Sequence, residues 1–561
     1  MGGSCEASSA PVRFAELCAR TCFSFLQGAS HPEEMVERAH ELGLASIALC
    51  DRDGLYGSAR AHVAARKLGQ PVIVGAELTI ARSASTLLLL AEDHDGYSGL
   101  CRLLTRAHEG QEKGTAKLPL EELATSPKGL WAVLPSPYDA ALCGAVVESF
   151  GRRHVRIAVQ RLLDPEQRAR EREAIALASR LGVRIAATTR ALMHDPGRKP
   201  LADVLACIRH KTTLDDAGPV LQLNAEAVLR SGAWMDRRFG DHPEWLASTL
   251  EVAEACRFSL GELRYRFPCE AACTNETPDE ALERLVREKL LWRYPQGTPP
   301  AVQSQLRKEL ALIRELQVAP YFLSVWEIVE IARDKSILCQ GRGSAANSAV
   351  CFVLGITAVD PARANLLFER FLSAERRDPP DIDVDFEHER REEVIQEIYR
   401  RYGRDRAAMV SEVISYRGKS ALREVGKTFG LSQEQADRLS GMLTHSYSGI
   451  EVTPERIEEQ GLDPGDARIR QILSVATQLL RFPRHLSIHV GGFVLSAEPL
   501  ERIAPVEPGR MTGRTVIPWD KDDLDALGFF KVDILGLGML TCIRKALGHV
   551  MPEHEPLKAL A

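Results

Sequence analysis

Residues 380–386 read PDIDVDF, with an aspartate at every second position. Alternate residues of a β-strand share a face, so Asp381, Asp383 and Asp385 are predicted to line one side of a strand while the apolar residues between them pack into a core. Adjacent carboxylates raise one another's pKa unless a cation lies among them. Because Mg²⁺ prefers oxygen ligands, the strand suggests a metal-assisted phosphoryl-transfer site. The alternative is an edge strand that carries charge against aggregation.

The size and composition indicate a multidomain soluble protein. A chain of 561 residues is too long for one core, so three or four domains are expected. The net charge of −6 excludes a uniformly basic nucleic-acid binder but is compatible with a local basic groove. The 13 cysteines include no CxxC pair, which favours free thiols over zinc ligands and predicts a cytoplasmic location. No signal peptide is expected, and the apolar run at 87–91 is too short to span a bilayer.

Short apolar segments alternate with amphipathic ones over the first 255 residues, which predicts an α/β fold with a mostly parallel sheet or barrel. Loops or linkers are expected at 268–278 and 294–300, where Pro and polar residues gather. The expected strands are 46–50, 71–74, 86–90, 130–134, 155–159, 183–187, 381–386, 491–495 and 530–534. The expected helices are 33–42, 59–68, 97–108, 166–181, 302–317, 321–335, 389–401, 418–429, 432–443 and 468–481.

A glycine-rich loop, GRGSAANS at 341–348, precedes an apolar helix expected from about Ala349. Glycines allow the backbone to approach an anion closely, and a helix N-terminus offers free N–H groups. With the charge of Arg342 and the hydroxyl of Ser344 next to Gly343, the loop suits a triphosphate. It is not a P-loop, because the GK[ST] ending is missing. The alternative is a plain turn that caps a helix.

A second acidic strand is expected at residues 530–536, FKVDILG. Its Lys531 and Asp533 would face one way and Val532 and Ile534 the other. Asp533 could complete a metal site begun at the aspartate strand. A strand pair held by a salt bridge is the alternative.

A basic face is predicted on the helix at 418–429. Lys419, Arg423 and Lys427 recur at every fourth position, and Arg417 comes just before them. Such a face can follow the phosphates of a nucleic-acid backbone. A solvated surface helix would show the same spacing, so both interpretations stay open.

The order of four segments resembles a known family, the bacterial C-family DNA polymerases, which are the DNA polymerase III α-subunits. The segments are GRGSAANS, LLFERFLSAERRDPPDIDVDFEHERR, RHLSIHVGG and WDKDDLDALGFFKVDILGLG. The details HERREE, RHLSIHVGGFVLS and WDKDDLDALG are more similar to the error-prone branch used in damage tolerance. The resemblance runs from about residue 14 to about 546. It implies an error-prone DNA-directed DNA polymerase acting in damage-induced mutagenesis and repair synthesis.

The resemblance also implies the roles of the site residues. Two Mg²⁺ ions would be held by Asp381, Asp383 and Asp533, which would thus be the catalytic carboxylates. Triphosphate binding would fall to Gly343 and Ser344, with Arg342 beside them. Apart from the resemblance, Lys531 is expected to bind substrate and the basic helix face to bind DNA. Gly491 and Gly492 would let the backbone approach the primer terminus. The implied partners are primer-template DNA, dNTP and, in the full-length family, other mutasome proteins and the sliding clamp.

The implied architecture is a PHP-like (β/α) barrel at 1–255 and a nucleotidyltransferase-type palm with a mixed sheet at 256–412 and 489–538. A helical thumb at 413–488 would be inserted in the palm, and 539–561 would begin the fingers. Family members continue for several hundred residues, so the chain is expected to be truncated after the palm. The alternative function is therefore a catalytically silent fragment that binds DNA or mutasome proteins.

The PHP-like domain is expected to bind no metal ions. PHP domains build a metal site from HxH, TDH and DxH motifs, and histidines and one aspartate of these motifs are replaced here. Glu77 survives, and arginines are predicted to pair with Asp51, Asp53 and Glu77 as a structural ion network. A PHP-type phosphoesterase is therefore disfavoured. The substituted positions are Cys18, Arg20, Arg52, Arg190 and Leu192.

Overall fold

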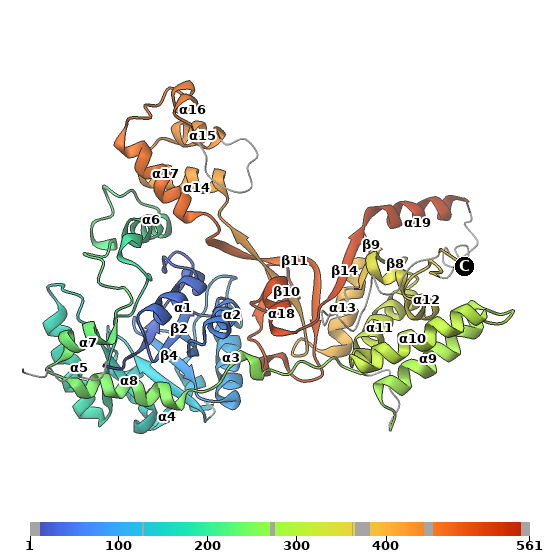
Figure 1. Ribbon diagram of the computed structural model, residues 1–561, viewed down its shortest axis with the longest axis horizontal. Coiled ribbons are helices and arrows are strands. Elements are labelled where there is room, and N and C mark those ends of the chain that lie inside the picture. The colour runs from blue at the N-terminus through green and yellow to red at the C-terminus, as the bar shows by residue number, and fades with distance from the viewer. Residues whose placement is uncertain are drawn as a thin grey trace, which may run out of the picture. The chain divides into compact units, whose positions relative to one another are not determined.

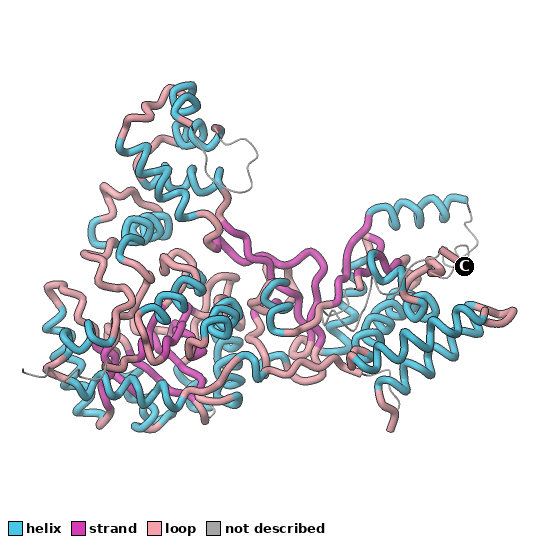
Figure 2. The backbone as a smooth tube through the Cα atoms, viewed as in Figure 1, coloured by secondary structure: helices cyan, strands magenta, loops and turns pink. Residues whose placement is uncertain are grey.

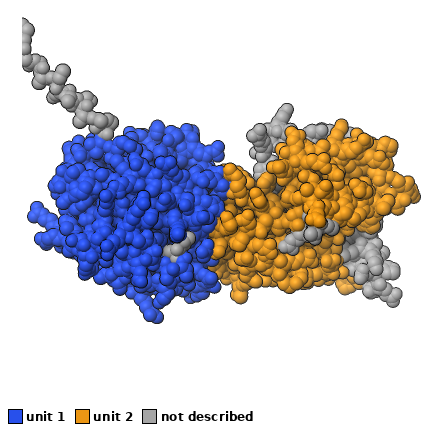
Figure 3. Space-filling model, turned by 90° about the horizontal axis from the view of Figure 1, so that it is seen from below, with its two compact units in different colours: residues 1–263, 413–487 blue, residues 264–412, 488–561 orange. Residues whose placement is uncertain are grey.

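The computed structural model describes residues 12–125, 128–269, 275–361, 363–364, 382–442 and 453–550. The chain forms two compact units (Figure 3). Unit 1 comprises residues 1–263 and 413–487, and unit 2 comprises residues 264–412 and 488–561. The segment 413–487, expected as a separate thumb, thus groups with the N-terminal residues. Within the described part of the chain, no helix combines the length and apolar character needed to cross a membrane.

Unit 1 is built on a seven-stranded sheet whose strands follow one another in chain order. All neighbouring strands are parallel except β4, which runs antiparallel to both β3 and β5. The short connection at 80–85 explains this reversal, because a parallel crossover needs a dozen or more residues, about the length of a helix with its loops. The strands are β1 (Ala15–Ala19), β2 (Ser46–Arg52), β3 (Val72–Thr79), β4 (Thr86–Ala91), β5 (Leu130–Leu134), β6 (Val155–Val159) and β7 (Arg184–Ala187).

Helices surround this sheet (Figures 1 and 2). The last of them, α8, packs against both β1 and β7 and so bridges the first and last strands. The buried Glu16 of β1 also accepts hydrogen bonds from the backbone and hydroxyl of Thr189, just after β7, at 2.8 and 2.7 Å. The helices are α1 (Pro32–Glu41), α2 (Ser58–Leu68), α3 (His94–His108), α4 (Ala140–Phe150), α5 (Gln167–Leu181), α6 (Lys199–His210), α7 (Gly232–Phe239) and α8 (Pro243–Ala255).

Four more helices of unit 1 come from residues 413–487. Their apolar side chains, such as Leu422 and Val425, share one buried cluster with Leu201, Val204 and Leu205 of α6. Residues three and four apart lie on one face of a helix, so α6 offers a continuous apolar stripe to them. The four are α14 (Gly418–Thr428), α15 (Gln433–Gly441), α16 (Pro454–Glu459) and α17 (Ala467–Leu479).

Unit 2 contains most of a mixed sheet in the order β12-β13-β10-β11-β14-β9-β8. The central pair β14 and β9 is parallel, whereas β11 and β8 run antiparallel to their neighbours β14 and β9. The mixed sheet is what the sequence predicted for a palm. The strands are β8 (Cys339–Arg342), β9 (Asp383–Glu387), β10 (Ala407–Ser415), β11 (Pro483–Leu495), β12 (Glu507–Pro508), β13 (Thr515–Val516) and β14 (Val532–Leu537).

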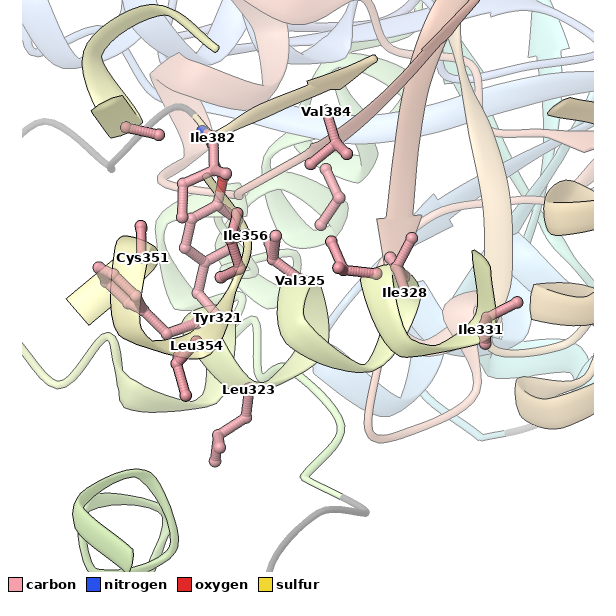
Figure 4. Close-up of a cluster of buried hydrophobic side chains, with 14 of the residues drawn as sticks. Tyr321, Leu323, Val325, Ile328, Ile331, Cys351, Leu354, Ile356, Ile382 and Val384 are labelled. Carbon is pink, nitrogen blue, oxygen red and sulfur yellow. Dashed lines mark hydrogen bonds between the residues drawn. The ribbon is translucent and has the colours of Figure 1, made fainter. Parts of the chain in front are cut away.

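One face of β9 packs into the core of unit 2. Val384 and Phe386 are fully buried, as is Ile382 just before the strand, as the alternating pattern predicted. Figure 4 shows Val384 and Ile382 above side chains of α11 such as Tyr321 and Val325. The helices of unit 2 are α9 (Pro278–Arg293), α10 (Pro300–Glu315), α11 (Ala319–Asp334), α12 (Ala349–Leu354), α13 (Arg391–Tyr402), α18 (Lys521–Leu527) and α19 (Gly538–Val550).

A buried hydrogen bond fixes the start of the aspartate strand. The backbone N–H of Ile382 donates to the hydroxyl of Tyr321 at 2.8 Å. Tyr321→Phe removes this acceptor next to Asp383, so we expect the free energy of unfolding to fall by about 1–3 kcal/mol in urea titrations. Tyr294→Phe is the control. The Tyr294 hydroxyl donates to Asp360, and both residues are half-buried, so water can replace the lost hydrogen bond. Equal stability of both variants would contradict this role of Tyr321.

Candidate active site

Two aspartates from distant parts of the sequence lie side by side on neighbouring strands. Asp383 of β9 and Asp533 of β14 are direct partners in the parallel register of the two strands. Such strands lie about 4.8 Å apart, and in-register side chains share a face. Val384 and Ile534 are fully buried on the opposite face. The predicted meeting of distant acids is therefore found for Asp383 and Asp533, whereas Asp381 lies outside the described residues.

Asp533 combines one neutralised oxygen with one unpaired oxygen. Its Oδ2 contacts Nζ of Lys531, and both side chains are buried. Its Oδ1 is also buried and has no hydrogen-bond partner in the described part of the chain. A buried carboxylate oxygen without a donor is costly, and a divalent cation would satisfy it. Asp533 thus fits the ligand set expected of a metal site.

His489 of β11 is a neighbour of Asp533 that the sequence did not single out. Its Nδ1 lies 3.8 Å from Asp533 Oδ1. This nitrogen accepts hydrogen bonds from the backbone N–H groups of Gly491 and Gly492, at 3.3 and 2.7 Å. It therefore carries a lone pair and no proton, so it leaves the Asp533 oxygen available to a cation.

The two glycines of β11 have a packing role in this structure. A Cβ atom on Gly491 would lie 2.5 Å from Leu535 Cδ2 and 2.7 Å from the carbonyl oxygen of Ile534. The glycine thus allows β11 to approach β14 closely. The approach of Gly491 and Gly492 to a primer terminus stays a prediction.

Arg342 supplies a cation beside the aspartates of β9. It lies opposite Asp383 in the antiparallel register of β8 and β9. Its Nε is 3.3 Å from Asp385 Oδ2 and 3.9 Å from Asp383 Oδ2. Burial raises the pKa of Asp385, and the charge of Arg342 opposes that shift. Because 53% of the Arg342 side chain is exposed, it is also within reach of an anionic ligand.

The glycine-rich loop passes close to the same carboxylates. Gly343 has a φ of +68°, a left-handed conformation that favours glycine. A Cβ atom at this residue would lie 3.8 Å from Asp383 Oδ2. Residues Gly343–Asn347 continue as a short 3-10 helix that leads to α12. The structure thus brings Arg342 and Gly343 close to Asp383, and the binding of a triphosphate by Arg342, Gly343 and Ser344 stays a prediction.

The N-terminus of α12 is not free, which corrects the prediction that it would hold phosphate. Glu309 of α10 accepts the backbone N–H groups of Ala349 and Val350 at 2.9 and 3.0 Å, and the hydroxyl of Ser348 at 2.8 Å. Ser348 in turn accepts the N–H of Cys351 at 3.1 Å. A carboxylate from the protein itself occupies the donors, so an anion would have to use the loop before them.

Glu309 is a second residue that the sequence analysis missed. It is fully buried, and burial raises its pKa while the hydrogen bonds from the α12 N-terminus oppose that shift. A signal was present in the sequence. Val302, Leu306, Glu309 and Ile313 form the buried stripe of α10, and a charged residue within an apolar stripe indicates a buried polar partner.

The predicted basic face lies on α14 of unit 1. Arg423 donates through Nε to Asp437 at 2.7 Å, so its charge is largely matched. Arg417 and Lys419 are exposed and Lys427 is half-buried. Arg417 is the N-cap residue of this helix. Contact of these four residues with DNA stays a prediction.

A second charged cluster surrounds Glu77, at the end of β3 in unit 1. Arg20 Nε lies 2.6 Å from Glu77 Oε2. The other carboxylate oxygen, Oε1, lies 2.7 Å from Arg190 Nη2 and 3.5 Å from Arg52 Nη1. Burial opposes ionisation of Glu77, but Arg190 and Arg20 hold the pKa of this carboxyl well below its usual range. Both oxygens are engaged by guanidinium groups, so Glu77 does not fit a metal-ligand set.

The predicted pairing of arginines with acids holds for Glu77 and Asp53 but is wrong for Asp51. Arg52 Nε lies 3.4 Å from Asp53 Oδ2. Asp51 instead accepts hydrogen bonds from the backbone and hydroxyl of Thr21, at 2.8 and 2.7 Å, and from the hydroxyl of Ser24 at 2.7 Å. Neutral donors suffice there, and burial raises the pKa of Asp51.

Two family models match this chain. The model described as bacterial DNA polymerase III alpha NTPase domain covers residues 280–536, which include Glu309, Arg342, Asp383, His489 and Asp533. The PHP domain model covers residues 16–171, which include the Glu77 cluster except for Arg190. The predicted resemblance to the bacterial C-family DNA polymerases is confirmed. The expected PHP-like domain at the N-terminal end is likewise confirmed.

Similar proteins carry the name error-prone DNA polymerase. One from Anaeromyxobacter dehalogenans (strain 2CP-C) is 45% identical over 98% of this chain and 56% of that protein. One from Alkalilimnicola ehrlichii is 47% identical over 96% of this chain and 52% of that protein. The chain thus spans about half the length of these relatives. A solved amidohydrolase from Chromobacterium violaceum aligns with 31% of this chain and 86% of its own, at 16% identity and a TM-score of 0.25.

The Glu77 cluster predicts a defined response to acid. The folded pKa of Glu77 lies below its ordinary value of 4.5, so its stabilisation is present above pH 4.5 and is lost as the pH falls below it. Glu77→Gln should lower the free energy of unfolding at pH 7 by about 3–5 kcal/mol, because guanidinium groups stay buried without a counter-charge. Its stability should also depend less on pH below 4.5 than that of the unmodified protein. Urea titrations across this range measure both effects.

The exposed Glu37→Gln, on α1 of the same unit, is the matched control and should leave stability within about 0.5 kcal/mol. If Glu77→Gln also unfolds like the unmodified protein at pH 7, the arginines are not held by this carboxylate.

Proposed function

We propose that this protein transfers deoxynucleotides from dNTPs to the 3′-hydroxyl of a primer on a DNA template, in damage-induced mutagenesis and repair synthesis. The observation that carries the proposal is the in-register pair of Asp383 and Asp533, with one buried Asp533 oxygen left unpaired. The family match over residues 280–536 and the names of the relatives support the same reaction class.

The residues proposed to hold divalent ions are Asp381, Asp383 and Asp533, and the ions proposed are two Mg²⁺. Bound there, Mg²⁺ would activate the primer hydroxyl and offset the charge of the reacting phosphates. Asp383 keeps 30% of its side chain exposed and so remains accessible from solvent. Asp381 is included on the strength of its motif alone.

The proposed triphosphate contacts are Arg342, Gly343 and Ser344. Arg342 is shared between Asp383 and Asp385 in this structure, and its exposed guanidinium has donors to offer an incoming phosphate. Gly343 lies beside Asp383 and has no side chain, which leaves room for a bulky anion. Lys531 is buried against Asp533, so its first contribution is to orient that carboxylate. Direct contact of Lys531 with substrate is proposed as well.

Primer extension tests the proposed reaction. Asp383→Asn and Asp533→Asn should each lower the extension rate by about 100-fold or more, because both remove charge preorganised for the transition state. Asp522→Asn, an exposed aspartate on α18 of the same unit, is the control and should leave the rate unchanged. Circular dichroism melting checks that all three proteins are folded. Extension that survives both site variants would rule out this site.

A second candidate function rests on the predicted basic face of α14, where Arg417 and Lys419 are exposed. It is a catalytically silent protein that binds primer-template DNA. In that case no extension occurs, whereas binding to labelled primer-template persists and weakens steeply with salt. Lys419→Gln and Lys427→Gln should then weaken binding, since both cations lie on the predicted basic face of α14.

Glu309 is proposed to position the substrate loop. Glu309→Ala removes the acceptor for the start of α12 and should raise the KM for dNTP about tenfold, equivalent to about 1.4 kcal/mol, with a smaller effect on kcat. Glu309→Gln keeps a carbonyl acceptor and should change KM by less than about threefold. Steady-state primer extension at varied dNTP measures both. Equal KM values in all three proteins would exclude a positioning role.

A further inference from the structure

A pocket of about 460 Å³ opens in unit 1 where strands β2 and β3 begin. Its lining includes Ser46, the first residue of β2, and Val72, the first residue of β3. The Glu77 cluster lies at the other ends of these strands, so the pocket is a separate site. Its volume lies within the usual range for small-molecule sites, about 300–1,000 Å³.

The pocket carries surplus positive charge. Three arginines line it, and the sole lining carboxylate, Glu254, lies 3.6 Å from one of them, Arg13. Arg66 of α2 forms no ion pair or hydrogen bond with any described residue. Arg257 donates through Nε to the backbone carbonyl of Glu254 at 3.0 Å and, over the same described ranges, pairs with no carboxylate. Two exposed guanidinium groups therefore face one concave surface without a counter-ion.

Neutral polar groups lie beside these cations. His62 precedes Arg66 by one helical turn, so both side chains project from the same face of α2. Burial, together with the charge of Arg66, lowers the pKa of His62, and the ring is therefore neutral at pH 7. Its Nδ1 lies 3.5 Å from the hydroxyl of Ser259, which also lines the pocket. An imidazole and a hydroxyl can donate to an anion without adding negative charge.

Apolar side chains complete the lining, among them Val74, Leu250 and Leu260. A bare anion would leave most of this surface uncovered. Guanidinium forks match phosphate oxygens in geometry, and two of them suit a dianion better than a single carboxylate. We propose that this pocket binds a phosphorylated small molecule of about the size of a nucleoside monophosphate, with its phosphate between Arg66 and Arg257.

Calorimetric titration of the full chain with AMP tests the proposal. We expect saturable binding that weakens about tenfold or more in each of Arg66→Gln and Arg257→Gln. Both arginines are exposed, so the variants should fold. Arg153→Gln, an exposed arginine elsewhere in unit 1, should bind AMP normally. Asp383→Asn should also bind AMP normally, which separates this pocket from the proposed polymerase site in unit 2.

Adenosine and inorganic phosphate are the comparison ligands. Weaker binding of both than of AMP supports a site that uses the phosphate and the organic part together. If adenosine binds as tightly as AMP, the arginines do not bind a phosphate group. If inorganic phosphate binds as tightly as AMP, the pocket does not recognise the organic part of the ligand. No AMP binding, or AMP binding unchanged in both arginine variants, would overturn the proposal as a whole.

Discussion

The parallel pairing of β9 with β14 is the constraint on which the candidate active site depends. It places Asp383 and Asp533 in register, and two carboxylates so close repel each other. The fold tolerates them because their strands are held from behind by a fully buried apolar face. It also supplies cations from two sides, Arg342 beside Asp383 and Lys531 beside Asp533. The core thus fixes a local charge arrangement that would be unfavourable by itself.

Sequence periodicity predicted those parts of the fold that have a strong local pattern. The aspartate strand was recognised because its period of two separates acids from apolar residues. Strands β2 to β7 of unit 1 were predicted because they are apolar runs, whereas β1 was not predicted. Strand β8 was missed because it is short and runs into a glycine-rich loop, and α9 was missed because Pro278 at its start was taken for part of a linker. The reversal of β4 depends on connection length, which periodicity does not measure.

The candidate site was predictable only up to the contacts that tertiary structure creates. Asp383, Asp533 and Arg342 belong to segments with recognisable composition, so their residue types pointed to phosphoryl chemistry. Glu309 accepts hydrogen bonds from the start of α12, which is distant in the sequence, and His489 lies 3.8 Å from Asp533 of another strand. The occupied N-terminus of α12 illustrates the limit: a loop followed by a helix predicts free N–H groups, but whether a distant carboxylate fills them depends on how α10 packs.

The acidic sites around Glu77 and Asp533 differ in how their charge is balanced. Both oxygens of Glu77 are engaged by guanidinium groups that belong to the chain itself, and the cluster needs no exchangeable ion to be neutralised. Asp533 has a tethered cation on one oxygen and an unpaired, buried second oxygen. A site that must bind and release charged ligands cannot saturate its carboxylates with its own side chains. The incomplete pairing of Asp533 therefore favours unit 2, and not the Glu77 cluster, as the place for the proposed metal-dependent chemistry.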